Sequence, residues 1–255
     1  MAYLYSSLLA ILLTIAFLSG YFFPNAQTKT VTTSHIASKD FTLDKDLPDF
    51  RNYNDIQQKK TDFFMYLLPL VQAENAKIEK ERAFIKSVQY DLNRLSQVDM
   101  IELQHLANKY KVEGDIEEST VEELLKRVNT IPASLVLAQA ANESAWGTSR
   151  FARKGNNLFG QWCYVKGCGI VPKHRSKHQK HEVAKFSSVQ HSVASYMLNL
   201  NSQFSYDVLR DLRANNSNIS GHELANGLIK YSTRREAYVH EIQLMIRQNG
   251  LHQYD

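Results

Sequence analysis

Glu143 is the residue of this chain whose setting most favours acid–base chemistry. It lies in the run QAANESAWG, close to the C-terminal end of a predicted helix and beside Trp146. A carboxyl on an apolar helix face is partly desolvated, and the negative end of the helix dipole lies nearby; both effects raise its pKa. Such a carboxyl can serve as the general acid of a glycosidase. The alternative is a solvated residue at a helix end, with Trp146 as a core aromatic.

A helix must position this carboxyl. Thr130 is predicted as its N-cap, Pro132 lies in the first turn, where a missing N–H costs little, and Gly147 is placed to end it. Residues three and four apart share a helical face. The face that carries the carboxyl is therefore predicted to comprise Leu135, Ala138, Gln139, Asn142, Glu143 and Trp146.

Two longer runs resemble a known family. AQAANESAWGTSRFARKGNNLFG (138–160) looks like the signature of the bacterial glucosaminidase domain family. GLIKYSTRREAYVHEI (227–242) is similar to the family's terminal pattern, with Tyr231 and Tyr238 at its two tyrosines. The second run departs from the pattern at Ser232 and at Arg234–Arg235, where the family has Ala and Asp-Pro. The resemblance covers about 128–250, and the closest subgroup is the Bax-like proteins of Gram-negative bacteria.

The resemblance implies a mainly α, lysozyme-like catalytic domain with a small β-lobe. It implies cleavage of peptidoglycan glycan strands, at the β-1,4 bond next to N-acetylglucosamine, with Glu143 as the catalytic acid and no cofactor. The residues predicted to contact the substrate are Gln139, Trp146, Asn157, Phe159 and Tyr238.

The second catalytic group is open. Glycoside hydrolysis usually needs two carboxyls. The resemblance implies a second acid on the β-lobe, where Glu182 is the candidate and an ordinary exposed strand residue is the alternative. The 2-acetamido oxygen of the substrate could instead attack the anomeric carbon, a known exception to the two-carboxyl rule. Tyr231 would then orient that group or stabilise positive charge on the sugar, unless it is a core tyrosine.

The N-terminal segment predicts the compartment. Residues 2–23 carry no charged side chain, and at about 1.5 Å per residue they can span the ~30 Å hydrocarbon core of a bilayer. We expect residues 1–26 to be a single-pass inner-membrane anchor, with the catalytic domain in the periplasm. A signal segment whose cleavage releases the protein is the alternative, although a basic n-region and a good cleavage site are missing.

Three further regions are predicted after this segment. Residues 27–53 are polar and read as a tether, and 128–255 form the glucosaminidase-like domain. Between them, 54–127 form a helical extension in which apolar residues at helical spacing are interrupted at Pro69, which predicts a helix, a kink and a helix. Two shorter helices are expected at 99–110 and 120–128, with Ser119 or Thr120 capping the second.

The charge pattern bears on the partner. The net charge of +4 is mild, but the stretch 150–185 is rich in Lys and Arg, and Glu182 is its only acid. Such a stretch attracts polyanions. No motif that reads nucleic acid accompanies it, so nucleic acid is not an expected partner. The carboxylates of peptidoglycan peptides are the expected one, with a solvated basic loop as the alternative. The sequence predicts no oligomeric state.

The two cysteines and a histidine cluster remain. Cys163 and Cys168 are predicted to form a disulfide in an oxidising periplasm, worth roughly 2 kcal/mol by loop entropy. His174, His178 and His181 have a spacing that suits helical metal ligands, but the intervening Lys and Arg residues repel a divalent cation. The run HEVAK lacks the second histidine of a zinc-protease motif, and no metal site is predicted.

Two rival functions fit the same residues. A lytic transglycosylase also uses one acid but closes an intramolecular anhydro ring. A non-catalytic protein that binds the wall or assists its assembly would retain the cleft without the reaction. The sequence favours the hydrolase over both.

Overall fold

The computed structural model describes residues 46–173, 175–176 and 178–255. The predicted membrane anchor and most of the predicted tether lie outside these residues. None of the helices within the described ranges is both long and apolar enough to span a membrane. The last part of the predicted tether is folded, because Phe50 lies in a short 3₁₀ helix (Phe50–Asn52) and is buried.

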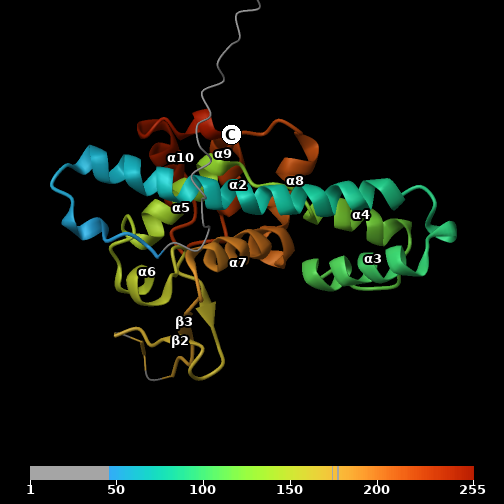
Figure 1. Ribbon diagram of the computed structural model, residues 1–255, viewed down its shortest axis with the longest axis horizontal. Coiled ribbons are helices and arrows are strands. Elements are labelled where there is room, and N and C mark those ends of the chain that lie inside the picture. Colours follow the sequence, from blue (N-terminus) through green and yellow to red (C-terminus); the bar gives the residue numbers. More distant parts are fainter. Residues whose placement is uncertain (1–45, 174, 177) are drawn as a thin grey trace, which may run out of the picture. The chain divides into compact units, whose positions relative to one another are not determined.

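The extension is built on one long helix, α2 (Ile56–Val88), which runs across the molecule in Figure 1. The side chain of Asp55 caps it by accepting hydrogen bonds from the backbone N–H groups of Gln57 and Gln58. The predicted interruption at Pro69 was wrong, since the helix continues through it. Proline removes the hydrogen bond to the carbonyl four residues earlier. That residue is Met65, which lies on the exposed side of α2 and is 54% exposed.

Two shorter helices complete the extension, α3 (Gln97–Tyr110) and α4 (Glu118–Arg127). They lie together beneath one half of α2 (Figure 1). The expected cap of α4 was wrong: its N-cap is Glu117, which makes no side-chain capping bond, and the helix begins ahead of Ser119. The threonine at 120 is buried instead, and its hydroxyl donates to the carbonyl of Asp115.

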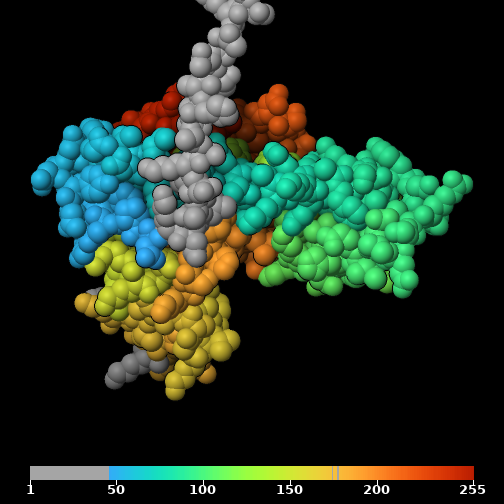
Figure 2. All heavy atoms as spheres, in the orientation of Figure 1, coloured from blue at the N-terminus to red at the C-terminus, as the bar shows by residue number. Residues whose placement is uncertain are grey.

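The remaining chain is mainly helical, with a small antiparallel sheet. Its helices are α5 (Ala133–Ser144), α6 (Arg150–Gly155), α7 (Val189–Ser202), α8 (Asp207–Asn215), α9 (Gly221–Leu224) and α10 (Glu236–Gln248). The sheet, in the order β1-β3-β2, consists of β1 (Trp162–Cys163), β2 (Gly169–Ile170) and β3 (Glu182–Ala184). In the space-filling view the segment that carries these strands protrudes from the helical body (Figure 2). The predicted mainly α fold with a small β-lobe is confirmed.

The extension and the domain share one hydrophobic core. Helix α2 contacts both α5 and α7, and its Phe63, Leu67 and Ile85 are fully buried. Arg213 of α8 makes a second link, because its guanidinium donates to the backbone carbonyls of Lys126 and Arg127 at the end of α4. Burial lowers the pKa of Arg213 to about 9. The residues of the extension therefore support the helix that carries the candidate acid.

Candidate active site

Helix α5 is the most deeply buried helix near the candidate acid, and Glu143 lies in its last turn. The predicted N-cap at Thr130 was wrong, because the helix begins at Ala133 with Pro132 as its cap. The side chain of Asp255 accepts hydrogen bonds from the backbone N–H and the hydroxyl of Ser134. A carboxylate at this end of a helix is favoured by the helix dipole. No local sequence pattern predicts this contact, which joins residues 121 positions apart.

The chain leaves α5 through a tight left-handed turn. Ala145, Trp146 and Gly147 have positive φ values of 50°, 59° and 73°. The helix thus ends before the predicted stop at Gly147, and Trp146 does not share the helical face of Glu143. Its ring packs against Phe63 and Phe64 of α2 instead, with centroid distances of 5.8 and 5.3 Å. Non-glycine residues in this backbone region store strain that surrounding packing must hold.

The environment of Glu143 is set by burial, by Tyr238 and by the side-chain amide of Asn142, which donates to Oε1 at 3.4 Å. Burial raises the pKa of its carboxyl above the ordinary value. The hydroxyl of Tyr238 donates to Oε1 at 2.8 Å, which opposes that rise without cancelling it. Gly160 lies on the other side of the carboxyl, where an added Cβ would come within 3.7 Å of Oε2. The carboxyl is therefore partly buried, and it keeps its proton to a higher pH than an exposed glutamate does.

Behind the carboxyl lies a buried polar chain. The side-chain amide of Gln139 donates to the hydroxyl of Tyr238 at 2.8 Å, and its carbonyl accepts from the hydroxyl of Tyr196. Gln139 is fully buried, so both of its bonds replace lost contacts with water. Tyr196 was not among the predicted site residues. The chain orients the Tyr238 hydroxyl towards Glu143.

Tyr231 and Phe159 complete the cluster. The ring of Tyr231 stacks on that of Tyr238 at 5.3 Å and 7°, and its hydroxyl donates to the backbone carbonyl of Phe159 at 2.9 Å. The ring of Phe159 stacks on Tyr196 at 3.9 Å. Four of the predicted site residues, Gln139, Phe159, Tyr231 and Tyr238, are thus brought together with Glu143.

Asn157 holds the backbone of this region. Its side-chain amide donates to the carbonyls of Gln161 and Ala184, both at 2.9 Å, and its Oδ1 accepts from the N–H groups of Phe159 and Gln161. It is 1% exposed. Asn157 therefore shapes the loop that passes Glu143 and joins this loop to β3.

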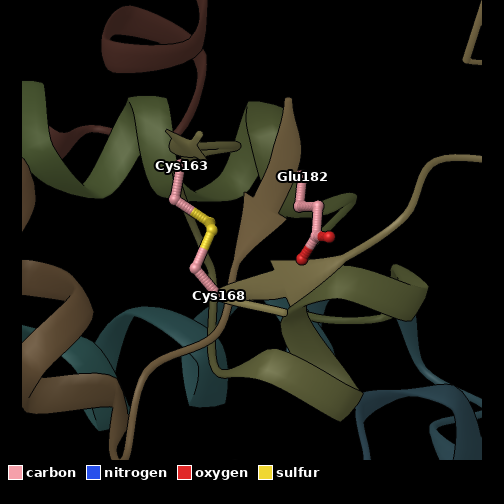
Figure 3. A group of neighbouring side chains, drawn as sticks. All are labelled: Cys163, Cys168 and Glu182. Carbon is pink, nitrogen blue, oxygen red and sulfur yellow. A yellow bond between two sulfur atoms is a disulfide. The ribbon is translucent and has the colours of Figure 1, made fainter. Parts of the chain in front are cut away.

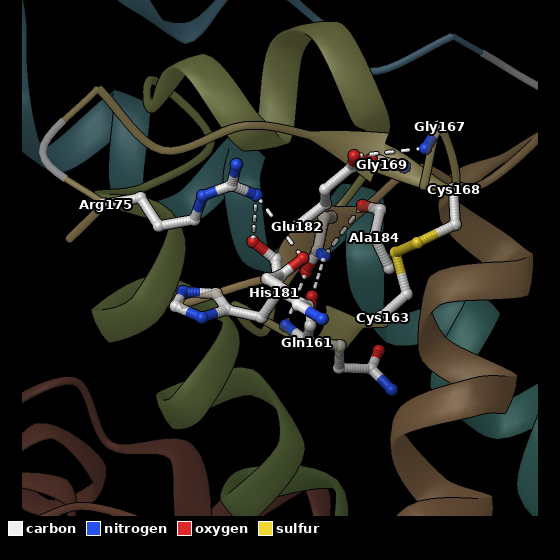
Figure 4. The surroundings of a disulfide bond; sticks show 11 residues. Gln161, Cys163, Gly167, Cys168, Gly169, Arg175, His181, Glu182 and Ala184 are labelled. Atoms are coloured by element: carbon white, nitrogen blue, oxygen red, sulfur yellow. Dashed lines mark hydrogen bonds between the residues drawn. A yellow bond between two sulfur atoms is a disulfide. The ribbon is translucent and has the colours of Figure 1, made fainter. Parts of the chain in front are cut away.

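Glu182 lies in a different setting, on the β-lobe. Its two carboxylate oxygens accept hydrogen bonds from the backbone N–H groups of Gly167, at 3.0 Å, and Gly169, at 2.8 Å (Figure 4). These bonds lower the pKa of Glu182. Both glycines flank Cys168, which forms the predicted disulfide with Cys163, so this prediction is confirmed. The described hydrogen bonds of Glu182 stay within the lobe and do not reach the Glu143 cluster.

One group of side chains has the spacing of a metal site among the described residues: Cys163, Cys168 and Glu182 (Figure 3). Their ligand atoms lie within 4.8 Å of one another. The two sulfurs are bonded to each other, whereas metal ligation needs thiolates, so this group does not fit a metal. Of the histidines considered in the sequence, His181 stacks on the ring of Trp162, and His174 lies outside the described residues.

The structure is a mainly helical domain with a small β-lobe, and its one partly buried carboxyl beside Tyr238 has the environment of a general acid. The model of the glucosaminidase family, described as mannosyl-glycoprotein endo-beta-N-acetylglucosaminidase, matches residues 118–251. The chain belongs to this family. It is 31% identical over 267 residues to Protein bax of Escherichia coli (strain K12), and the alignment covers 96% of this chain and 94% of that protein.

A solved structure also resembles this one. It is the catalytic domain of the autolysin Auto from Listeria monocytogenes, 23% identical in sequence. The match covers 69% of this chain and 87% of that domain, with a TM-score of 0.40.

Proposed function

We propose that this protein hydrolyses peptidoglycan glycan strands at the β-1,4 bond next to N-acetylglucosamine, with Glu143 as the general acid. The observation that carries the proposal is the environment of Glu143: burial favours the protonated carboxyl, and the Tyr238 hydroxyl holds Oε1. A carboxyl whose pKa is raised keeps its proton to a higher pH, and it can transfer that proton to the oxygen that leaves the anomeric carbon. Membership of the glucosaminidase family supports the choice of substrate.

We further propose that the 2-acetamido oxygen of the substrate acts as the nucleophile. It would bond to the anomeric carbon while the glycosidic C–O bond breaks and Glu143 protonates the leaving oxygen. Water, giving up a proton to the Glu143 carboxylate, would then open the cyclic intermediate. The support is the commitment of Glu182 to two backbone amides of the lobe. Tyr231, stacked beside Tyr238, is placed to orient the acetamido group.

Digestion of purified sacculi tests the reaction. Wild-type protein is expected to release fragments with new reducing ends at N-acetylglucosamine, and Glu143→Gln is expected to release none. Digestion that survives this substitution unchanged would remove Glu143 as the acid. If neither form digests sacculi while both sediment with them, the protein is a wall-binding protein.

A lytic transglycosylase is the second candidate, because a single acid near the reacting bond is also what that reaction uses. Glu143 is the one carboxylate in the described cluster with Gln139 and Tyr238. Mass analysis of the released fragments separates the two. Reducing ends support hydrolysis, whereas anhydro ends would replace it with transglycosylation.

The compartment is proposed on separate grounds. We propose a single-pass inner-membrane protein whose catalytic domain is periplasmic, with secretion after signal cleavage as the alternative. The uncharged stretch 2–23 and the disulfide support an oxidising compartment outside the cytoplasm. Fractionation of cells that express the full chain tests this, since an anchored form stays with the membrane after alkaline extraction and a cleaved form does not.

A further inference from the structure

The β-lobe carries a pocket that the catalytic cluster does not use. It has a volume of about 400 Å³ and lies between α6 and the loop that connects β2 to β3. The lining residues that matter here are Arg150, Phe151, Trp162, Lys173, Arg175 and His181. Successive residues of a strand point to opposite faces. His181 thus points away from the side of β3 on which Glu182 contacts the disulfide loop, and Figure 4 shows His181 and Arg175 apart from the disulfide.

The pocket has a rigid aromatic wall. Trp162 is 55% exposed, which is unusual for so large an apolar side chain. Its ring is nevertheless fixed, because it stacks on His181 at 3.8 Å and 11°, and His181 is 8% exposed. A tryptophan held flat at the surface offers contact area at little cost in conformational entropy. Such a surface suits the apolar face of a sugar or an alkyl chain.

The same pocket is lined by cations. Arg150, Lys173 and Arg175 line it, and none of the described lining residues carries a carboxylate. Arg150 donates through Nη2 to the carbonyl of Val171, and Arg175 donates through Nη1 to that of His181. A guanidinium has five N–H donors, so each of these bonds anchors the side chain and leaves further donors for a ligand. Planar guanidinium groups match carboxylates well.

The pocket adjoins the candidate acid along the chain. Gly160 borders the carboxyl of Glu143, and Trp162 follows two residues later. Two residues span at most about 7 Å. When the scissile bond of a glycan strand lies at Glu143, the peptide attached to the neighbouring sugar is therefore within reach of Trp162.

We propose that this pocket is a subsite for the carboxylate-bearing peptide attached to the glycan strand, with Trp162 contacting its apolar part and Arg150, Lys173 and Arg175 its carboxylates. The proposal rests on the proposed function, since it names a part of the same substrate. It assigns a binding role to the basic stretch of the β-lobe, confined to one pocket, and leaves the chemistry to Glu143.

The first test is direct binding, which does not depend on cleavage. The full chain carrying Glu143→Gln is titrated with a free tetrapeptide released from peptidoglycan, and the indole N–H signal of Trp162 is followed by NMR. We expect a saturable shift of that signal, and binding about tenfold weaker when the carboxyls of the peptide are converted to amides. No shift, or equal binding of the amidated peptide, would overturn the proposal. So would saturable binding to vesicles containing anionic lipid with no response to the peptide.

The second test is kinetic. Cleavage of intact sacculi is compared with cleavage of glycan strands whose peptides have been removed by an amidase. Trp162→Ala and Lys173→Gln should each lower the intact-to-stripped ratio of kcat/KM about tenfold, mainly through KM. Tyr90→Ala and Lys86→Gln are the matched controls, because both residues are exposed on the extension, and they should leave the ratio unchanged.

The outcomes separate the two proposals. A ratio that Trp162→Ala leaves unchanged, in a protein that cleaves both substrates, would overturn the subsite and leave the hydrolase standing. Failure of the wild type to cleave either substrate would overturn the proposed function, and the peptide titration would then still decide whether the pocket binds carboxylates.

Discussion

Glu143 and Glu182 are glutamates of one domain with opposite environments. Burial raises the pKa of Glu143, whose one strong partner is the Tyr238 hydroxyl. Two backbone N–H groups lower the pKa of Glu182. Glu143 therefore keeps its proton to a higher pH than an ordinary glutamate, and Glu182 loses its proton at a lower pH. Each carboxyl accepts two hydrogen bonds, from Tyr238 at 2.8 Å and Asn142 at 3.4 Å for Glu143, and from two backbone N–H groups at 3.0 and 2.8 Å for Glu182. Desolvation outweighs the hydrogen bonds at Glu143, whereas the hydrogen bonds outweigh desolvation at Glu182.

The largest expected effect is a difference in catalytic activity between variants of the two glutamates. Glu143→Gln should lower kcat on sacculi by about 10²–10⁴-fold, the usual range for a general acid, because the amide has no proton to transfer. Glu182→Gln, the matched control, should retain activity within about tenfold. A comparable loss in both variants, with azide restoring activity to Glu182→Ala, would make Glu182 the catalytic nucleophile or base.

The disulfide tests the environment of Glu182, because the two N–H groups that bind this carboxylate flank Cys168. Replacing both Cys163 and Cys168 by Ser should cost about 2 kcal/mol of unfolding free energy, by the loop-entropy estimate. The loop that presents the N–H groups of Gly167 and Gly169 would then be less ordered, and the pKa of Glu182 should rise towards its ordinary value. Urea unfolding measures the first effect, and reduction of the wild type should reproduce it. An unchanged midpoint would mean that the lobe is held without the bond.

A smaller effect concerns the pH dependence of the reaction. The Tyr238 hydroxyl stabilises the ionised form of Glu143, so Tyr238→Phe should raise the pKa of that carboxyl. A general acid works only while protonated, and the alkaline limb of kcat/KM should therefore move to higher pH. Tyr53→Phe is the control, because its hydroxyl donates to Asp62 in the extension. A limb that moves to lower pH, or not at all, would contradict this role of Tyr238.

The smallest effects should be opposite changes in stability at pH 7. A raised folded pKa means that the stability linked to Glu143 is complete below its unfolded pKa and is lost as pH rises through the folded pKa. Glu143→Gln removes that loss and should raise Tm by about 1–3 °C. The lowered pKa of Glu182 means stability that is present above its unfolded pKa and lost as pH falls through the folded one. Glu182→Gln should therefore lower Tm at pH 7, and calorimetry at pH 7 and pH 3 compares the two signs.

The sequence predicted the parts of the site that lie close together along the chain. Local runs of residues, together with their resemblance to the family, predicted the helix-end position of Glu143, the small β-lobe and the disulfide. The hydrogen bond between Tyr238 and Glu143 joins the two runs of sequence that resemble the family. These runs are far apart along the chain, and only the fold brings them into contact. The contact between Asp255 and the start of α5 had no local signal at all.

The predictions that failed did so where packing overrode a local rule. Helical spacing put Trp146 on the face of Glu143, but Ala145 already adopts a left-handed conformation, and the indole packs on Phe63 and Phe64 instead. The sequence predicted a helix, a kink and a helix around Pro69, whereas α2 is one helix from Ile56 to Val88. The packing of Trp146 on α2 was not specified by sequence periodicity.

The most direct test measures whether the pKa values of the two glutamates lie on opposite sides of the ordinary pKa of a glutamate carboxyl. Carbon-13 NMR of the glutamate side-chain carboxyls in the full chain measures both at once, with Glu143→Gln and Glu182→Gln assigning the two signals. We expect the Glu143 signal to titrate with a pKa above the ordinary glutamate value of 4.5 and the Glu182 signal with a pKa below it. A Glu143 signal that titrates at or below that of Glu182 would contradict it.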